Sequence, residues 1–184
     1  MTAIPKMQLL AQIEANIEQH LQTVTGRLQN LDEKKLLQPA ANGGWSIAQC
    51  LEHLNSYARY YLPEIDKALN KADLVYPATG SVKGTWLGRY FTRSMQPGNN
   101  AKKYKAPKDH VPVPELDAAK VISEFIGQQE QLLALVRKAQ KADLDKVRVP
   151  ISISRWIKMR LGDVFQFLTV HDERHMQQAL RHLA

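Results

Sequence analysis

The sequence has little of what stabilises secreted proteins or anchors membrane proteins. Cys50 is its only cysteine, so the chain can form no intrachain disulfide and no zinc site made of several cysteines. No apolar run approaches the roughly 20 residues that a membrane-spanning helix needs. The N-terminal segment reaches Gln and Glu before the apolar core of a signal peptide could form. These absences predict a cytoplasmic protein with no membrane partner.

Glycine and proline are also sparse, with nine of each among 184 residues, and no segment is repeated or of low complexity. Hydrophobic residues make up 44% of the chain and charged residues 23%, which is the balance of a folded, soluble domain. A chain of this length can bury a core of its own. We therefore expect a single domain that spans residues 1–184.

Four long segments have apolar residues at intervals of three and four, the pattern of helices with one buried face. They run from about Lys6 to Asn30, from Ser46 to about Lys71, from about Glu115 to Lys141, and from Trp156 or Leu161 to the C-terminus. Ser46 followed by Gln49 predicts the N-cap of the second helix. The pattern predicts an all-α bundle.

Proline and glycine are concentrated in residues 72–114, which predicts a long insertion between the second and third helices, with one short helix in TWLGRYFTRSM. A connection of this length in a compact domain often covers a site. Further along, apolar and polar residues alternate from Val147 to Ile153. Because no other stretch offers a partner strand, we interpret this segment as an ordered connection.

Basic residues with aromatic neighbours cluster in the same insertion. They are Arg89, Arg93, Lys102, Lys103, Lys105 and Lys108, with Tyr90, Phe91 and Tyr104 between them. A stacking platform for nucleic acid has this composition, but so does a solvated basic loop. We favour the solvated loop and expect no nucleic-acid partner.

The stretch HDERHMQQ, residues 171–178, places two histidines four apart near the C-terminus. Stepping along the fourth helix, the apolar stripe through Leu168 continues through His171 and His175. The residues expected on the solvated face are Asp172, Glu173, Arg174 and Gln177. Side chains four apart on a helix are about 5–6 Å apart at Cβ, so both imidazoles can bind one cation.

A firmly held metal needs a third ligand, and His53 in WSIAQCLEHLNSY fits because it lies beside Leu54 on the buried face of the second helix. The other histidines fit less well. His20 is expected off the apolar face of the first helix, His110 lies in the insertion beside prolines, and His182 is two turns beyond His175. The alternative is that the three histidines are satisfied separately by hydrogen bonds or solvent. We favour a metal site made of His53, His171 and His175.

The sequence resembles the DinB-like superfamily. The resemblance rests on WSIAQCLEHL after a Gly-Gly turn, on the four-helix layout and on HDERHMQQ, and it covers nearly the whole chain. It implies an up-down-down-up four-helix bundle and a divalent metal, zinc or nickel, on the histidines that match the family pattern, which are His53, His171 and His175. It also implies a small-molecule substrate, with a low-molecular-weight thiol as a candidate. A homodimer is a further expectation.

Two functions from different classes are open at this stage. One is a metal-dependent enzyme, a thiol-dependent transferase or isomerase or a hydrolase, for which Tyr57, Tyr61 and Asp172 are candidate acids or bases but none is singled out as catalytic. The other is a non-catalytic binding or stress-response protein whose basic loop contacts an acidic partner. A zinc protease of the HExxH type is not expected, because Asp172 replaces Glu and only nine residues follow His175.

Overall fold

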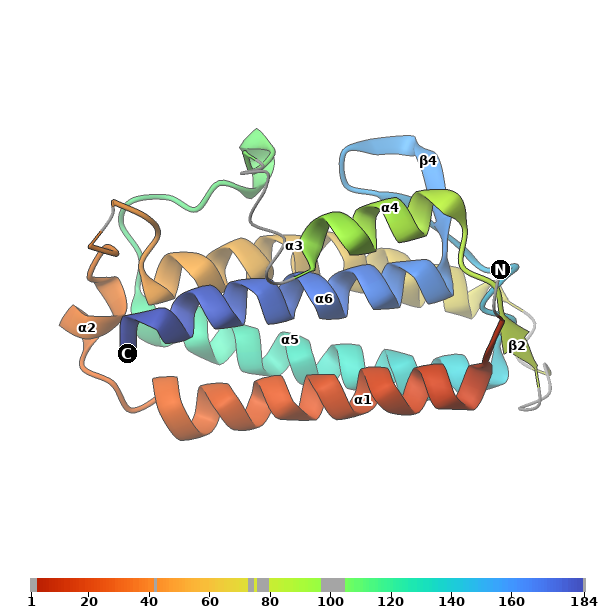
Figure 1. Ribbon diagram of the computed structural model, residues 1–184, viewed down its shortest axis with the longest axis horizontal. Coiled ribbons are helices and arrows are strands. Elements are labelled where there is room, and N and C mark those ends of the chain that lie inside the picture. Colours follow the sequence, from red (N-terminus) through yellow and green to blue (C-terminus); the bar gives the residue numbers. More distant parts are fainter. Residues whose placement is uncertain (1–2, 42, 73–74, 76–79, 97–104, 184) are drawn as a thin grey trace.

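Four long helices pack side by side and form most of the computed structural model of the chain (Figure 1). The structure describes residues 3–41, 43–72, 75, 80–96 and 105–183. The long helices are α1 (Lys6–Thr23), α3 (Ile47–Asn70), α5 (Ala118–Lys138) and α6 (Leu161–Leu180). The predicted all-α four-helix bundle is therefore confirmed.

The direction of the helices also agrees with the prediction. In Figure 1, α1 and α6 run from right to left, whereas α3 and α5 run from left to right. Each of α1 and α3 packs against both α5 and α6. The order is thus up-down-down-up, and the long insertion returns the chain so that α3 and α5 can lie parallel.

Local sequence signals explain where the helices begin. The Ser46 hydroxyl accepts a hydrogen bond from the Gln49 amide N–H, and the Gln49 side chain accepts one from the Ser46 N–H, which completes the predicted capping box of α3. Asp117 caps α5 by accepting from the Lys120 N–H. α1 is followed without a break by a π-helical turn, Val24–Leu28, and a short helix α2 (Glu33–Leu37) lies in the connection to α3.

The insertion carries the expected short helix, α4 (Trp86–Met95), which lies along α6. Thr85 caps it by accepting from the Gly88 N–H. A two-residue strand before it, β2 (Ser81–Val82), pairs antiparallel with β1 (Ile4–Pro5), and a 3-10 turn covers Lys108–His110. Of the predicted basic cluster, Lys102, Lys103 and Tyr104 lie outside the described residues.

The interpretation of residues 147–153 as a strandless connection is wrong. β3 (Arg148–Ile151) pairs antiparallel with β4 (Ser154–Arg160), so the partner strand is the segment that follows directly. The sequence pattern did not predict β4, because four residues in a row, Arg155–Lys158, are exposed and show no alternation of buried and exposed positions. Helix α6 consequently begins at Leu161, and Trp156 belongs to the hairpin.

Two apolar clusters fill the bundle. On α6, His171 and His175 lie between them, whereas His53 on α3 lies beside Leu54 of one cluster. One cluster contains Tyr57, Phe167 and Leu168, and the other contains Leu54 and Met176. The burial of Leu168 confirms the predicted stripe on α6.

Within the described part of the chain, no helix is both long and apolar enough to cross a membrane.

Candidate metal centre

The three predicted histidines meet in the interior of the bundle. His53 comes from the second turn of α3, and His171 and His175 occupy successive turns of α6. Their side chains are buried, with 3%, 1% and 8% of the residue surface exposed. One ring nitrogen from each lies within 4.8 Å of the others. The bundle therefore gathers three imidazole donors at one point, as a single cation would require.

Hydrogen bonds fix the tautomer of two of the rings. The Nδ1 atom of His53 lies 2.6 Å from the carbonyl oxygen of His110, and that of His175 lies 3.1 Å from the Gln178 side-chain oxygen. Both oxygens can only accept, so each Nδ1 carries the proton and each Nε2 keeps its lone pair. Holding the outer nitrogen in this way is what metal-bound histidines usually require.

The third ring leaves a polar atom without a partner. The Nε2 atoms of His53 and His171 are 3.2 Å apart, and because His53 Nε2 holds a lone pair, the contact needs a proton on His171 Nε2. His171 Nδ1 is then a buried acceptor that has no hydrogen-bond partner among the described residues. A cation would take up the lone pairs of His53 Nε2 and His175 Nε2, and His171 can offer its Nε2 as well once its proton moves to Nδ1, so the residues present fit a metal ion.

Burial keeps all three rings neutral near pH 7. Desolvation lowers the pKa of His53 to about 4 and that of His175 to about 3, where the nearby His53 adds to the effect. Desolvation, followed by the neighbouring histidines, also holds the pKa of His171 well below its ordinary value. Neutral imidazole is the form that binds metals, so none of the three rings has to release a proton to solvent at neutral pH.

A cavity of about 550 Å³ opens onto the histidines. Trp45 packs against His53 and His175 at centroid distances of 4.8 and 5.7 Å, and Tyr57 packs against His171 at 4.4 Å. The cationic side chains of Lys105 and Arg174 also line the cavity. The site is thus accessible to a small molecule and carries positive charge on its wall.

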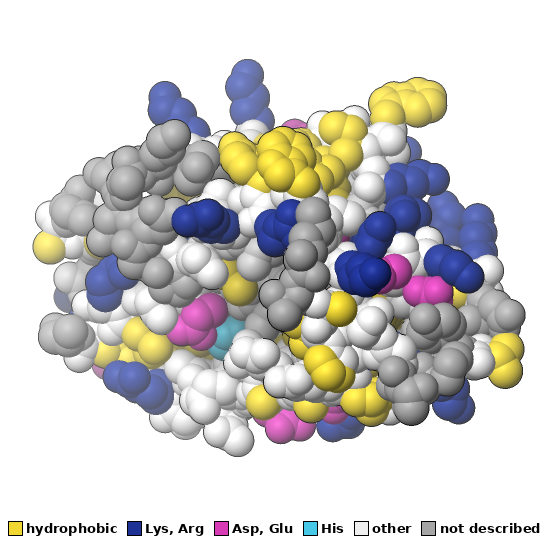
Figure 2. All heavy atoms as spheres, turned by 45° about the vertical axis from the view of Figure 1, so that its right-hand side comes forward, with side chains coloured by type: hydrophobic (Ala, Val, Ile, Leu, Met, Phe, Trp, Pro, Cys, Tyr) yellow, Lys and Arg dark blue, Asp and Glu magenta, His cyan; other side chains and the backbone are white. Residues whose placement is uncertain are grey.

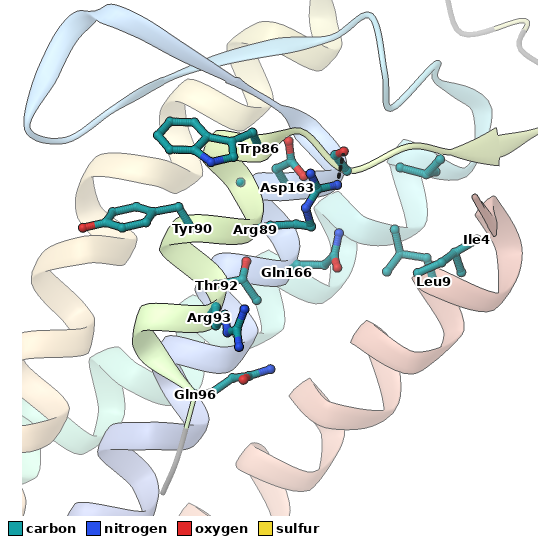
Figure 3. Close-up of a pocket in the computed structure, with 13 residues that line it drawn as sticks. Ile4, Leu9, Trp86, Arg89, Tyr90, Thr92, Arg93, Gln96, Asp163 and Gln166 are labelled. Atoms are coloured by element: carbon teal, nitrogen blue, oxygen red, sulfur yellow. Dashed lines mark hydrogen bonds between the residues drawn. The ribbon is translucent and has the colours of Figure 1, made fainter. Parts of the chain in front are cut away.

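A larger cavity, of about 730 Å³, lies between α4, α6 and the start of α1 and contains none of the three histidines. Figure 3 shows Arg89 and Gln166 on its wall, with an Arg89 guanidinium N–H donating to the Gly84 carbonyl. Asp163 at its edge accepts from the N–H and hydroxyl of Thr85. The chemistry of the histidine cluster is therefore confined to the smaller cavity.

His110 belongs to the site, although the sequence placed it only in the insertion. It is buried, stacks on Tyr57 at 3.9 Å, and uses its own carbonyl to hold His53. The single proton of the Ser56 hydroxyl goes to the His53 carbonyl, so His110 Nδ1–H donates to Ser56 and its Nε2 keeps a lone pair. No spacing signal in the sequence shows that the insertion returns to α3 here.

Two expectations about neighbouring polar residues are wrong. His20 is buried, not off the apolar face, because its Nε2 lies 3.1 Å from Glu173 on α6. Asp172 is not solvated but buried, and it accepts from the Gln129 amide at 2.9 Å. Burial raises the pKa of Asp172 to about 6. Both side chains use hydrogen bonds between helices that a one-dimensional pattern does not show.

The three candidate acids or bases therefore differ in position. Tyr57 lines the histidine cavity, and burial raises its pKa to about 12, so its hydroxyl is neutral. Tyr61 accepts a hydrogen bond from the Ser152 N–H of the hairpin. Asp172 faces Gln129 on α5. His182, the remaining histidine, lies with its Nε2 3.0 Å from the Trp45 carbonyl and is not part of the cluster.

The bundle and its buried histidine cluster define a four-helix protein with a candidate metal centre between its second and fourth long helices. The chain belongs to the DinB superfamily, whose family model matches residues 16–179. A search of curated proteins finds no match.

One solved structure similar to this chain is YfiT from Bacillus subtilis, described as a probable metal-dependent hydrolase with an unusual four-helix bundle topology. The two sequences are 14% identical, and the alignment covers 97% of this chain and 85% of that chain with a TM-score of 0.50. At this identity the likeness shows the fold and not the reaction.

Proposed function

We propose that the protein is a metal-dependent enzyme in which His53, His171 and His175 hold one divalent cation, zinc or nickel. The observation that carries the proposal is the convergence of three neutral imidazoles, two of them with the outer nitrogen anchored to an acceptor. Zinc and nickel both accept imidazole ligands. Three protein ligands leave room on the ion for a small molecule, as in catalytic sites and unlike closed structural sites.

A cation bound here would lower the pKa of a coordinated thiol or water and so supply a nucleophile near neutral pH. We take a low-molecular-weight thiol as the co-substrate, which makes the protein a transferase or isomerase. Water in its place would make it a hydrolase, the class named in the description of YfiT.

The chain's own residues restrict the substrate. Lys105 and Arg174 on the cavity wall favour a small molecule with a negative charge. The neutral Tyr57 hydroxyl is a hydrogen-bond donor in the same cavity. The site thus offers cationic side chains and a hydrogen-bond donor that can position such a substrate.

A spectroscopic titration of cobalt-loaded protein distinguishes a thiol from water as the nucleophile. Titration with cysteine or 2-mercaptoethanol should produce a near-ultraviolet thiolate-to-cobalt band in wild-type protein and none in His171→Ala. An unchanged spectrum, together with metal-dependent hydrolysis of a 4-nitrophenyl ester, would overturn the thiol proposal in favour of water. Loaded protein with neither property would contradict an enzymatic role.

A further inference from the structure

The β3–β4 hairpin presents large apolar side chains to solvent. Trp156 is 95% exposed, and Ile153 and Ile157 are 59% and 44% exposed. Figure 1 shows the hairpin standing out from the bundle above α4. A soluble domain seldom leaves a tryptophan so fully exposed on a projecting element, and clustered exposure of this kind marks an interaction surface.

The outer side of α4 extends this surface. Trp86 and Tyr90 are 71% and 52% exposed, and their rings stack at 6.0 Å. Figure 3 shows both rings on the side of α4 opposite to Gln166, beneath the hairpin. Since β4 contacts α4, the two sets of side chains adjoin. Figure 2 shows apolar side chains gathered on the upper side of the molecule with Lys and Arg around them.

A basic groove of about 330 Å³ lies on the other flank of the hairpin, against α3. Its cations are Lys67, Lys71, Arg148, Arg155 and Lys158, and Glu64 is the one acidic residue among the described residues that line it. Within the described residues, none of these five cations forms an ion pair with a carboxylate. A concave surface lined by one sign of charge concentrates its field and attracts anions.

We propose that this aromatic–basic face, made of the hairpin, the outer side of α4 and the groove, docks on an anionic phospholipid bilayer. The groove cations would meet lipid phosphates, while the tryptophan and tyrosine rings would lie at the headgroup level, where such rings are enriched. Our sequence-based expectation of no membrane partner considered spanning segments only, and a surface contact needs none.

Other occupants fit the face less well. A second copy related by twofold symmetry would bring its own cations against those of the first, since such an interface uses the same patch on both partners. Nucleic acid would use the groove and the Trp156 ring, but it offers no partner for the exposed Ile153 and Ile157. A bilayer satisfies both the charges and the aliphatic side chains.

Vesicle co-sedimentation tests the proposal. Wild-type protein should pellet with vesicles of phosphatidylcholine mixed with phosphatidylglycerol, much less with phosphatidylcholine alone, and less as salt is raised. Arg155→Ser with Lys158→Ser should bind the anionic vesicles roughly thirtyfold more weakly, given the usual contribution of each cation near such a surface. Trp156→Ala should also lose binding, and the blue shift of tryptophan emission on vesicles should disappear with it.

Lys34→Ser with Lys120→Ser is the matched control, because it removes the same charge from exposed positions on other elements and should bind like wild type. Melting curves check that every variant folds, which is expected since the substituted side chains are exposed. Equal binding of the hairpin variant and its control, or no vesicle binding by wild type, would overturn the proposal. Tighter binding of wild type to a single-stranded oligonucleotide than to anionic vesicles would also overturn it. So would the finding that wild type is a dimer which the Trp156→Ala substitution dissociates.

Discussion

The outer nitrogens of His53 and His175 face different kinds of acceptor. His53 Nδ1 is held by a backbone carbonyl, which no side-chain substitution removes, whereas His175 Nδ1 is held by the side chain of Gln178. The His175–Gln178 contact can therefore be removed by substitution of Gln178, which would change the orientation of the His175 ring and leave His175 itself in place.

Gln178→Leu should weaken metal binding by about 10- to 100-fold, the usual cost of removing a partner of a metal-bound histidine. The leucine cannot accept from His175 Nδ1, so the ring loses both its preferred tautomer and its orientation. Isothermal titration with zinc would measure the effect.

Gln177→Leu provides the control for this substitution. Gln177 is the neighbouring residue on α6, is exposed, and donates to Glu173 away from the cluster. Its replacement should leave zinc affinity unchanged. Equal affinities of the two variants would show that Gln178 does not position His175.

The position of helix α4 depends on a close approach to α6. A Cβ atom added at Gly88 would overlap the side chain of Asp163, which accepts from the N–H and hydroxyl of Thr85 at the start of α4. α4 also brings Met95 to the wall of the histidine cavity. A glycine thus sets the distance between the insertion and the bundle.

Gly88→Ala should destabilise the fold by about 1–3 kcal/mol, because the overlap forces α4 away from α6 and strains the Thr85–Asp163 hydrogen bonds. Gly127→Ala on α5, where an added Cβ meets no described atom within 4 Å, should instead be neutral or stabilise by up to about 1 kcal/mol. Urea unfolding of both variants checks the contrast. A Gly88→Ala protein as stable as wild type would mean that α4 does not pack this closely.

The elements that the sequence predicted well are those with local signals. The capping box at Ser46 and the periodic apolar faces located α3 and the other long helices, and the stripe through Leu168 oriented His171 and His175 correctly. The predictions that were wrong concern β4, His20 and Asp172, whose structure depends on contacts that the local sequence pattern does not show. From Arg155 to Lys158, β4 has no alternation because side chains on both of its faces are exposed. His20 and Asp172 are buried where α6 and α5 supply partners for them.

For the whole molecule, burying neutral histidines ties stability to pH. The pKa values of His53 and His175 are about 4 and 3 in the folded state, below the ordinary value of 6.5 that applies when the chain unfolds. At pH values between the folded and the unfolded pKa, the unfolded chain binds more protons than the folded chain. The stability that the two neutral histidines contribute is therefore fully present above pH 6.5 and is lost as pH falls toward their folded pKa values. Asp172 acts in the opposite direction, because its pKa is raised from 3.8 to about 6.

In the presence of a metal chelator, the free energy of unfolding should therefore fall between pH 7 and pH 5, by on the order of 1 kcal/mol for each histidine. Asp172→Asn removes the opposing contribution and should make the fall steeper. Urea titrations of both proteins at the two pH values measure this. Stability that is constant or rises toward pH 5 would show that the histidines are not buried as neutral rings.

We propose that His53, His171 and His175 act as one unit on one cation, and titration of zinc into untagged protein is the direct test. Wild type should bind one ion per chain, each single Ala variant should lose roughly 100-fold or more in affinity, and a second Ala should cost little further, since shared ligands are not additive. His182→Ala, which alters a histidine outside the cluster, should bind like wild type. Wild type that binds no zinc, or a His53→Ala variant that binds as tightly as wild type, would show that these histidines do not form one metal site.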